Sequence, residues 1–187
     1  MTFTHGNLAT PNSFQKHAFR VFCDFEFSDF TNPELLSIGL VTEDGRELYI
    51  ERADAAEIEV SDFVKTDVLP LFGSESPEVL AYEEIGDRVV EWFDSLRGGD
   101  RSVVIEVISD SEFDHRLLSN LQPSPAWLQS VNVVTRLVQH LLSGRKFFRY
   151  DIESTERHLG LGVQHHALID SRVMREAYAA AVTLERE

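Results

Sequence analysis

The sequence predicts an α/β protein in which a mixed β-sheet is flanked by helices. Three strand-like segments follow one another in the first third of the chain, separated by short polar connections, which is typical of an antiparallel meander. Helical and strand-like segments then alternate, and this alternation favours parallel strands with helices on both faces of the sheet. The 187 residues are 43% apolar, which is sufficient for one packed domain.

The N-terminal residues 1–16 are rich in Thr, Asn, Gly and Pro without periodicity, and we interpret them as a flexible leader. Residues 17–187 show no repeat and no shift in composition, so we expect a single domain there. Its first three strands are predicted at residues 18–27, 35–42 and 47–52. An Asp-Gly pair in the second connection fits a short hairpin turn.

The middle of the chain is predicted to contain helices that lead back to the sheet. Residues 61–72 begin with a Ser-Asp cap signal, and residues 82–97 carry apolar side chains at helical spacing before a Gly-Gly pair. A β-branched run at residues 102–109 predicts a buried strand, and Ser111 is a suitable cap for the short helix that follows.

The last third of the sequence continues the alternation. A strand is expected at residues 130–135 and a helix at residues 136–144. Residues 151–160 are weakly helical, and the Ala-rich segment at residues 165–184 favours a long final helix.

The charge, the cysteine count and the hydropathy limit the possible partners. A net charge of −15 repels polyanions over most of the surface, which argues against a broad basic nucleic-acid interface. The single cysteine, Cys23, cannot form an intrachain disulfide, as suits a reducing compartment. Because no apolar run is long enough for a membrane span or a signal peptide, we expect a cytoplasmic protein with no membrane partner.

Two acids lie within the most apolar strand. Successive side chains of a strand point to opposite faces, so Asp24 and Glu26 share one face while Cys23, Phe25 and Phe27 anchor the other. Burying neighbouring carboxylates is costly unless their charge is offset. An Arg or Lys partner, a solvent-facing strand edge or a divalent cation could each offset it.

Two further acids and a histidine join this pattern. Asp114 follows the predicted strand at residues 102–109, and Asp170 lies at the start of the last helix; each alone is typical of a cap or a solvated side chain. Together, four carboxylates suit two Mg²⁺ or Mn²⁺ ions, the arrangement used for displacement at phosphorus. His165 lies about one helical turn before Asp170 and could accept a proton in the same cleft.

Three motifs in this order resemble those of the DEDDh superfamily of 3′-5′ exonucleases. They are Asp24-Phe25-Glu26 in the first strand, Phe113-Asp114 after a central strand, and HHALID, residues 165–170, at the last helix. The chain is most similar to a small bacterial branch, the exoribonuclease-like domains, in the segments LLSIGLVTEDGREL, FVKTDVLP and FDH, at residues 35–48, 63–70 and 113–115.

This resemblance implies a ribonuclease H-like fold and the removal of nucleoside 5′-monophosphates from single-stranded RNA or DNA 3′ ends, with two Mg²⁺ or Mn²⁺ ions. It implies that Asp24 bridges the ions, that Glu26 and Asp170 bind the ion on the nucleophile side, and that Asp114 completes the second site. It also implies that His165 is the general base, with His166 as the rival.

Candidates for substrate contact are Phe25, Phe27, Phe113 and His115. Phe27 stands where most of the superfamily has Thr, and core packing is its first interpretation. Asp110 stands where Asn is more common, and it could hold a water on the metal or cap the helix.

Other features are left open. The basic-aromatic segment RKFFRY, residues 145–150, could guide a strand or could be a solvated face, and Phe147-Phe148 could support a homodimer. His5, His17, His140 and His158 follow no ligand spacing, so we expect structural or exposed roles for them. The alternative functions are a DNA-preferring exonuclease, a non-catalytic nucleic-acid or protein-binding module with the same fold, and an endonuclease of ribonuclease H type.

Overall fold

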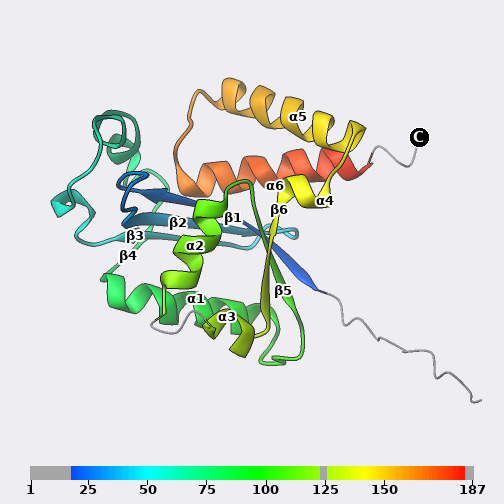
Figure 1. The fold of residues 1–187 in the computed structure, drawn as a ribbon, viewed down its shortest axis with the longest axis horizontal. Helices are drawn as coiled ribbons and strands as arrows, with labels where there is room; N and C mark the ends of the chain where they lie inside the picture. The colour runs from blue at the N-terminus through cyan, green and yellow to red at the C-terminus, as the bar shows by residue number, and fades with distance from the viewer. Residues whose placement is uncertain (1–17, 123–125, 184–187) are drawn as a thin grey trace, which may run out of the picture.

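The computed structural model describes residues 18–122 and 126–183, so the predicted leader at residues 1–16 lies outside the described residues. Within this part of the chain, six strands form one mixed sheet in the order β4-β3-β2-β1-β5-β6 (Figure 1). The strands are β1 (Phe19–Phe27), β2 (Leu35–Thr42), β3 (Glu47–Arg52), β4 (Glu78–Leu80), β5 (Ile105–Ser109) and β6 (Val133–Leu137).

Helices follow the first three strands and alternate with the later ones. The α-helices are α1 (Tyr82–Leu96), α2 (Glu112–Asn120), α3 (Trp127–Ser130), α4 (Val138–Leu141), α5 (Arg145–Leu161) and α6 (Ala167–Thr183). The segment predicted as a helix at 61–72 is irregular: it contains a π-helical turn, η2 (Val64–Val68), and a 3-10 turn, η3 (Leu69–Leu71), after the short η1 (Ala55–Glu57).

The strand directions confirm the predicted α/β class. β1, β2 and β3 pair antiparallel as a meander, whereas β5 pairs parallel to β1 and β6 parallel to β5. β4, which pairs parallel to β3, is not predicted from the sequence, because three residues are too few to give a period-2 pattern. The helix α5 begins at Arg145 and not near residue 151, so its first turns also differ from the prediction.

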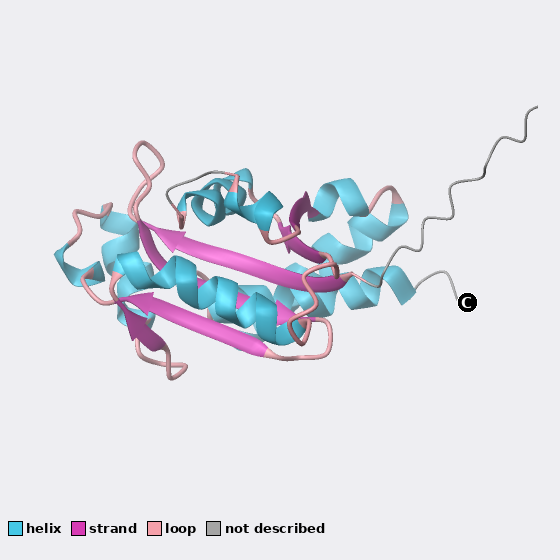
Figure 2. Cartoon of the chain, turned by 90° about the horizontal axis from the view of Figure 1, so that it is seen from below, coloured by secondary structure: helices cyan, strands magenta, loops and turns pink. Residues whose placement is uncertain are grey.

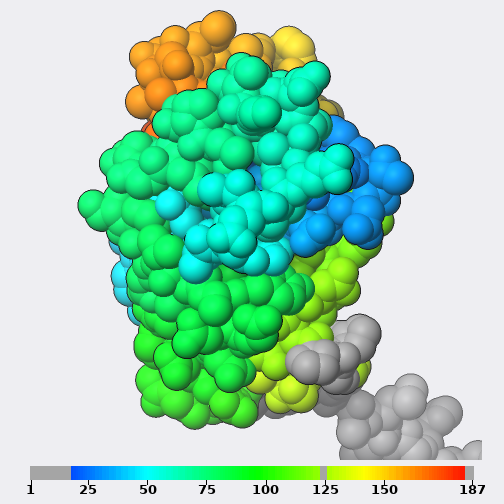
Figure 3. Space-filling model, turned by 90° about the vertical axis from the view of Figure 1, so that its left-hand side faces the viewer, coloured from blue at the N-terminus to red at the C-terminus, as the bar shows by residue number. Residues whose placement is uncertain are grey.

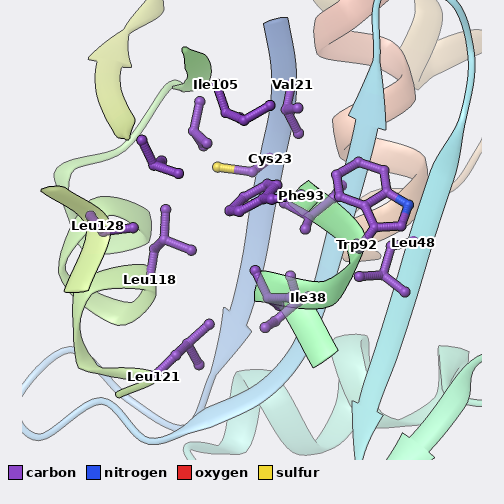
Figure 4. Close-up of a cluster of buried hydrophobic side chains, with 14 of the residues drawn as sticks. Val21, Cys23, Ile38, Leu48, Trp92, Phe93, Ile105, Leu118, Leu121 and Leu128 are labelled. Carbon is purple, nitrogen blue, oxygen red and sulfur yellow. The ribbon is translucent and has the colours of Figure 1, made fainter. Parts of the chain in front are cut away.

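Helices cover both faces of the sheet. On one face, Cys23 and Phe25 of β1 pack with Phe93 of α1 and Leu118 of α2 in the largest buried cluster, which is shown in part in Figure 4. Figure 2, seen from this side, shows α1 in front of the sheet, lying along the strands. On the other face, α6 packs against β1 and β2 and is covered in turn by α5.

One glycine sets how closely α6 approaches the sheet. Gly39 of β2 lies under the start of α6, where a Cβ atom would stand 2.1 Å from the carbonyl oxygen of Ala167. The hydroxyl of Ser171 donates a 2.9 Å hydrogen bond to the Gly39 carbonyl and holds the two elements together. Since Gly39 is the register partner of Asp24, this contact brings the first turn of α6 beside the acids of β1.

In the part of the chain that the structure describes, no helix has both the length and the apolar character needed to span a membrane.

Candidate functional site

Acids from three elements meet at the C-terminal end of β1. Asp24 and Glu26 alternate with buried Phe25, so they face α6 while Phe25 faces the core under α1. Asp170 lies in the first turn of α6, and Asp114 lies in the first turn of α2. The elements thus bring together the four acids that the sequence analysis had selected.

The carboxylates form two groups that share one residue. Oxygens of Asp24, Glu26 and Asp170 lie within 4.8 Å of one another, and so do oxygens of Asp24, Asp110 and Asp114. Asp110 is therefore a member of the cluster. It is not the helix cap, because the hydroxyl of Ser111 accepts the capping hydrogen bond from the Phe113 amide.

Burial and mutual repulsion disfavour the charged forms of these acids. Desolvation and the neighbouring Asp114 carboxylate raise the pKa of Asp24 well above its ordinary value. Burial and Asp170 raise the pKa of Glu26 to about 8. Burial and repulsion from Asp110 likewise raise the pKa of Asp114, although amide hydrogen bonds from Ser111 and Phe25 partly oppose this.

A divalent cation fits this environment. Among the residues that the structure describes, no Arg or Lys forms an ion pair with Asp24, Glu26 or Asp114. The side chain of Asp114 is buried, and its Oδ2 atom has no hydrogen-bond partner. A donor set composed only of carboxylate oxygens, without cysteine, matches the preferences of Mg²⁺ and Mn²⁺.

His165 lies at the junction of the two cavities that reach the acids. It lines a cavity of about 520 Å³ and a second of about 230 Å³, and Asp24 and Asp170 also line both. Its amide donates a 2.9 Å hydrogen bond to Asp170 Oδ2, and its ring meets the edge of Phe63 at a centroid distance of 4.8 Å. Its backbone is left-handed, with φ +63°.

His166 occupies a different environment. Only 2% of its surface is exposed, and its ring lies 4.8 Å from the ring of Tyr49. Burial lowers its pKa, and it lines neither of the cavities next to the acids. Of the two neighbouring histidines, His165 is therefore the one with access to the carboxylates.

The structure adds His158, which follows no ligand spacing along the chain. Its Nε2 atom lies 2.9 Å from Asp170 Oδ1, and this hydrogen bond raises the pKa of His158. The other oxygen of Asp170 accepts from the amides of His165 and His166. Asp170 is thus oriented by hydrogen bonds to both of its oxygens. The bond between His158 and Asp170 forms because α5 packs on α6, so it is visible only in the structure.

The larger cavity has an aromatic mouth. Phe25, Phe27, Phe30 and Phe63 line it together with Asp24 and Glu26. The ring of Phe27 stacks on that of Phe113 at 5.5 Å, and Phe30 meets the edges of both. The segment after β1 (blue) and the segment between β3 and α1 (cyan to green) meet on the face shown in Figure 3.

Two of the other candidates lie apart from this cavity. His115 does not line it; its ring is half-buried, its Nε2 atom has no partner, and burial lowers its pKa. In RKFFRY, Arg149 pairs with Glu153, while buried Tyr150 lines the smaller cavity. Phe147 and Phe148 are exposed on α5, so their role in a homodimer stays a prediction.

A scan against protein-family models finds no match to this chain, and a search of curated proteins finds no similar sequence.

Proposed function

We propose that this protein is a metal-dependent 3′-5′ exonuclease of DEDDh type with a ribonuclease H-like fold, acting on single-stranded RNA or DNA. The observation that carries the proposal is the pair of carboxylate groups that share Asp24, with His165 lining the same cavity. The motif order that resembles the superfamily, and most of all its bacterial exoribonuclease-like branch, supports the same activity.

The carboxylates of the chain could hold the two metal ions that such a reaction uses. Asp24, Glu26 and Asp170 would hold one Mg²⁺ or Mn²⁺ ion, and Asp24, Asp110 and Asp114 would hold the other. Bound ions would offset the carboxylate charge and act as Lewis acids on the scissile phosphodiester. Asp110 thereby extends the acid set that the motifs alone define.

His165 supplies the base that hydrolysis requires. Its imidazole would accept a proton from the attacking water, whose oxygen then bonds to phosphorus. The bond to the 3′-oxygen of the penultimate nucleotide breaks, and that oxygen takes a proton from solvent. The product is a nucleoside 5′-monophosphate, and the aromatic rings at the mouth of the cavity provide surfaces for an unpaired base.

The test is hydrolysis of a 5′-labelled single-stranded oligoribonucleotide, and of the matched DNA, with Mg²⁺ or Mn²⁺. We expect a ladder that shortens from the 3′ end and that is lost in His165→Ala. His140→Ala is the control, since it removes an exposed histidine of α4 that lines neither cavity. Internal cleavage would instead indicate an endonuclease, and a protein that binds neither ion would be a non-catalytic module.

A further inference from the structure

Most arginines in the described part of this acidic protein form an ion pair with a neighbouring acid. The pairs join distant elements as well as adjacent residues, and they leave little positive surface for a polyanion. Examples are Arg52 with Asp54, Arg88 with Glu78 and Arg172 with Glu47.

Arg116 is an exception beside the candidate site. It is exposed on α2, and within the described residues it forms no ion pair with an acid. Its guanidinium carbon lies 4.7 Å from the centroid of the Phe113 ring. Since Phe113 stacks on Phe27, which lines the larger cavity, the cation stands at the outer end of an aromatic stack that leads to the acids.

Phe30 completes this stack and is open to solvent. It is 74% exposed, although its ring lies within 5.4 Å of the Phe27 and Phe113 rings. An exposed phenylalanine ring does not gain the free energy of burial in the unliganded protein. It can gain that free energy when a ligand packs against it. Flat aromatic faces next to a guanidinium match an unpaired base and its phosphate.

We infer that Phe30, Phe113 and Arg116 form the surface that binds the nucleotides immediately 5′ of the scissile bond. The substrate is accordingly a short single strand. This inference rests on the proposed exonuclease function. A base stacks on the exposed ring of Phe30, and Arg116, held over the ring of Phe113, binds one backbone phosphate. Because the net charge is −15 and most of the described arginines pair with acids, we expect the contacts to end after about three nucleotides.

The test is binding of 5′-fluorescein oligoribonucleotides of two to ten nucleotides, followed by anisotropy with Mg²⁺ present. The His165→Ala background keeps the strand intact while leaving the carboxylates and the aromatic surface in place. We expect the affinity to rise up to about three nucleotides and then to stay constant. An affinity that keeps rising to ten nucleotides, or no binding at all, would overturn the inference.

Two substitutions separate phosphate binding from stacking. Arg116→Ala should weaken binding and lower the steepness of the salt dependence, d log K/d log [salt], by about 0.7, the contribution of one phosphate on a single strand. Phe30→Ala should weaken binding by about tenfold and leave that steepness unchanged. The electrostatic repulsion between the acidic protein and the oligonucleotide is nearly the same in each variant. It therefore cancels when the variants are compared with one another. Phe30 is used because its exposed ring contributes little to folding.

Arg145→Ala is the matched control. Arg145 is also exposed and without an acid partner among the described residues, but it begins α5, about 20 Å along the helix axis from His158. If Arg145→Ala changes binding as much as Arg116→Ala, the effect of Arg116 is not specific to this surface, whether it comes from net charge or from a strand guided by RKFFRY, and the inference is wrong. A smaller salt dependence in Arg116→Ala, without any hydrolysis by the wild type, would overturn the exonuclease proposal and leave a surface that binds single strands. Hydrolysis with unchanged binding in Arg116→Ala and Phe30→Ala would overturn only the strand surface.

Discussion

Cys23 and Asp24 are neighbours on β1, but their side chains lie on opposite faces of the strand. Burial of side chains is favourable on the first face and unfavourable on the second. The face under α1 is apolar throughout the cluster that contains Cys23 and Phe25, so its burial stabilises the fold. The face under α6 changes from buried Phe22 to Asp24 and Glu26, whose burial is unfavourable. The apolar face of β1 therefore stabilises the fold, whereas the opposite face, one residue along the strand, carries the candidate site.

The largest test of this division is Asp24→Asn. Asp24 belongs to both carboxylate groups, so we expect hydrolysis with Mg²⁺ to fall by at least about 10³-fold. In the absence of divalent ions the same variant should melt at a higher temperature than the wild type, because an amide is neutral without taking up a proton, whereas burial and neighbouring carboxylates disfavour the ionised form of Asp24. Thermal melts with EDTA and rate measurements with Mg²⁺ check the two effects.

Asp151→Asn is the control for that comparison, since it removes an exposed acid of α5 that belongs to neither group. It should change neither the melting temperature nor the rate appreciably. If Asp24→Asn melts at a lower temperature than the wild type without ions, repulsion and desolvation at Asp24 do not lower the stability of the protein.

The next test alters the distance between β1 and α6. Gly39→Ala places a Cβ against the backbone of Ala167, so the start of α6 must move away from Asp24. We expect the free energy of unfolding to fall by about 2 kcal/mol, as for overpacked cores, and the affinity for Mn²⁺ to fall with it. Urea denaturation and Mn²⁺ titration measure these changes.

Gly160→Ala is its matched control, because the added Cβ meets no atom within 4 Å in α5. It should raise the free energy of unfolding by up to about 1 kcal/mol. A Gly39→Ala protein that keeps the wild-type Mn²⁺ affinity would show that the position of α6 does not control the acid cluster.

A smaller effect is expected from pH. The pKa of Glu26 is about 8 in the folded protein and near 4.5 when unperturbed, so the folded state binds the proton more tightly. This contribution to stability is complete below pH 4.5 and is lost as the pH rises through 8. In EDTA the melting temperature should therefore decline over that range, whereas saturating Mg²⁺ should oppose the decline. Glu26→Gln should flatten the profile in EDTA, and an unchanged profile would contradict the assignment.

The smallest of these effects concerns His158. Removing the partner of Asp170 Oδ1 in His158→Ala should weaken Mn²⁺ binding by about tenfold, as is usual for residues that orient a metal ligand. His158→Gln, which can still donate a hydrogen bond, should recover part of the affinity. Equal affinity in all three proteins would limit the role of His158 to packing.

The sequence predicted the fold where the pattern is local. The boundaries of β2 and β3 agree with the prediction, and β1 differs by one residue, because alternation and turn signals act over a few positions. β4 and α3 are too short to show a period, and η2 departs from regular helix.

The candidate site divides in the same manner. The motif residues, such as Asp24 and Asp170, can be selected from the sequence because three short motifs occur together in the order of the superfamily that they resemble. His158 was missed because its contact with Asp170 arises from the packing of α5 on α6. Arg116 lies three residues after Phe113 in α2, so their contact is local, but the stacking of Phe113 on Phe27 of β1 is a tertiary contact.

The left-handed backbone of His165 gives this residue a conflict of its own. At φ +63°, a residue with a side chain is about 1 kcal/mol less favourable than in its ordinary conformations, whereas glycine accepts that geometry without strain. Glycine would therefore ease the turn between α5 and α6, but it would leave the junction of the two cavities without an imidazole. At this position foldability and reactivity favour different amino acids, and the chain carries the reactive one.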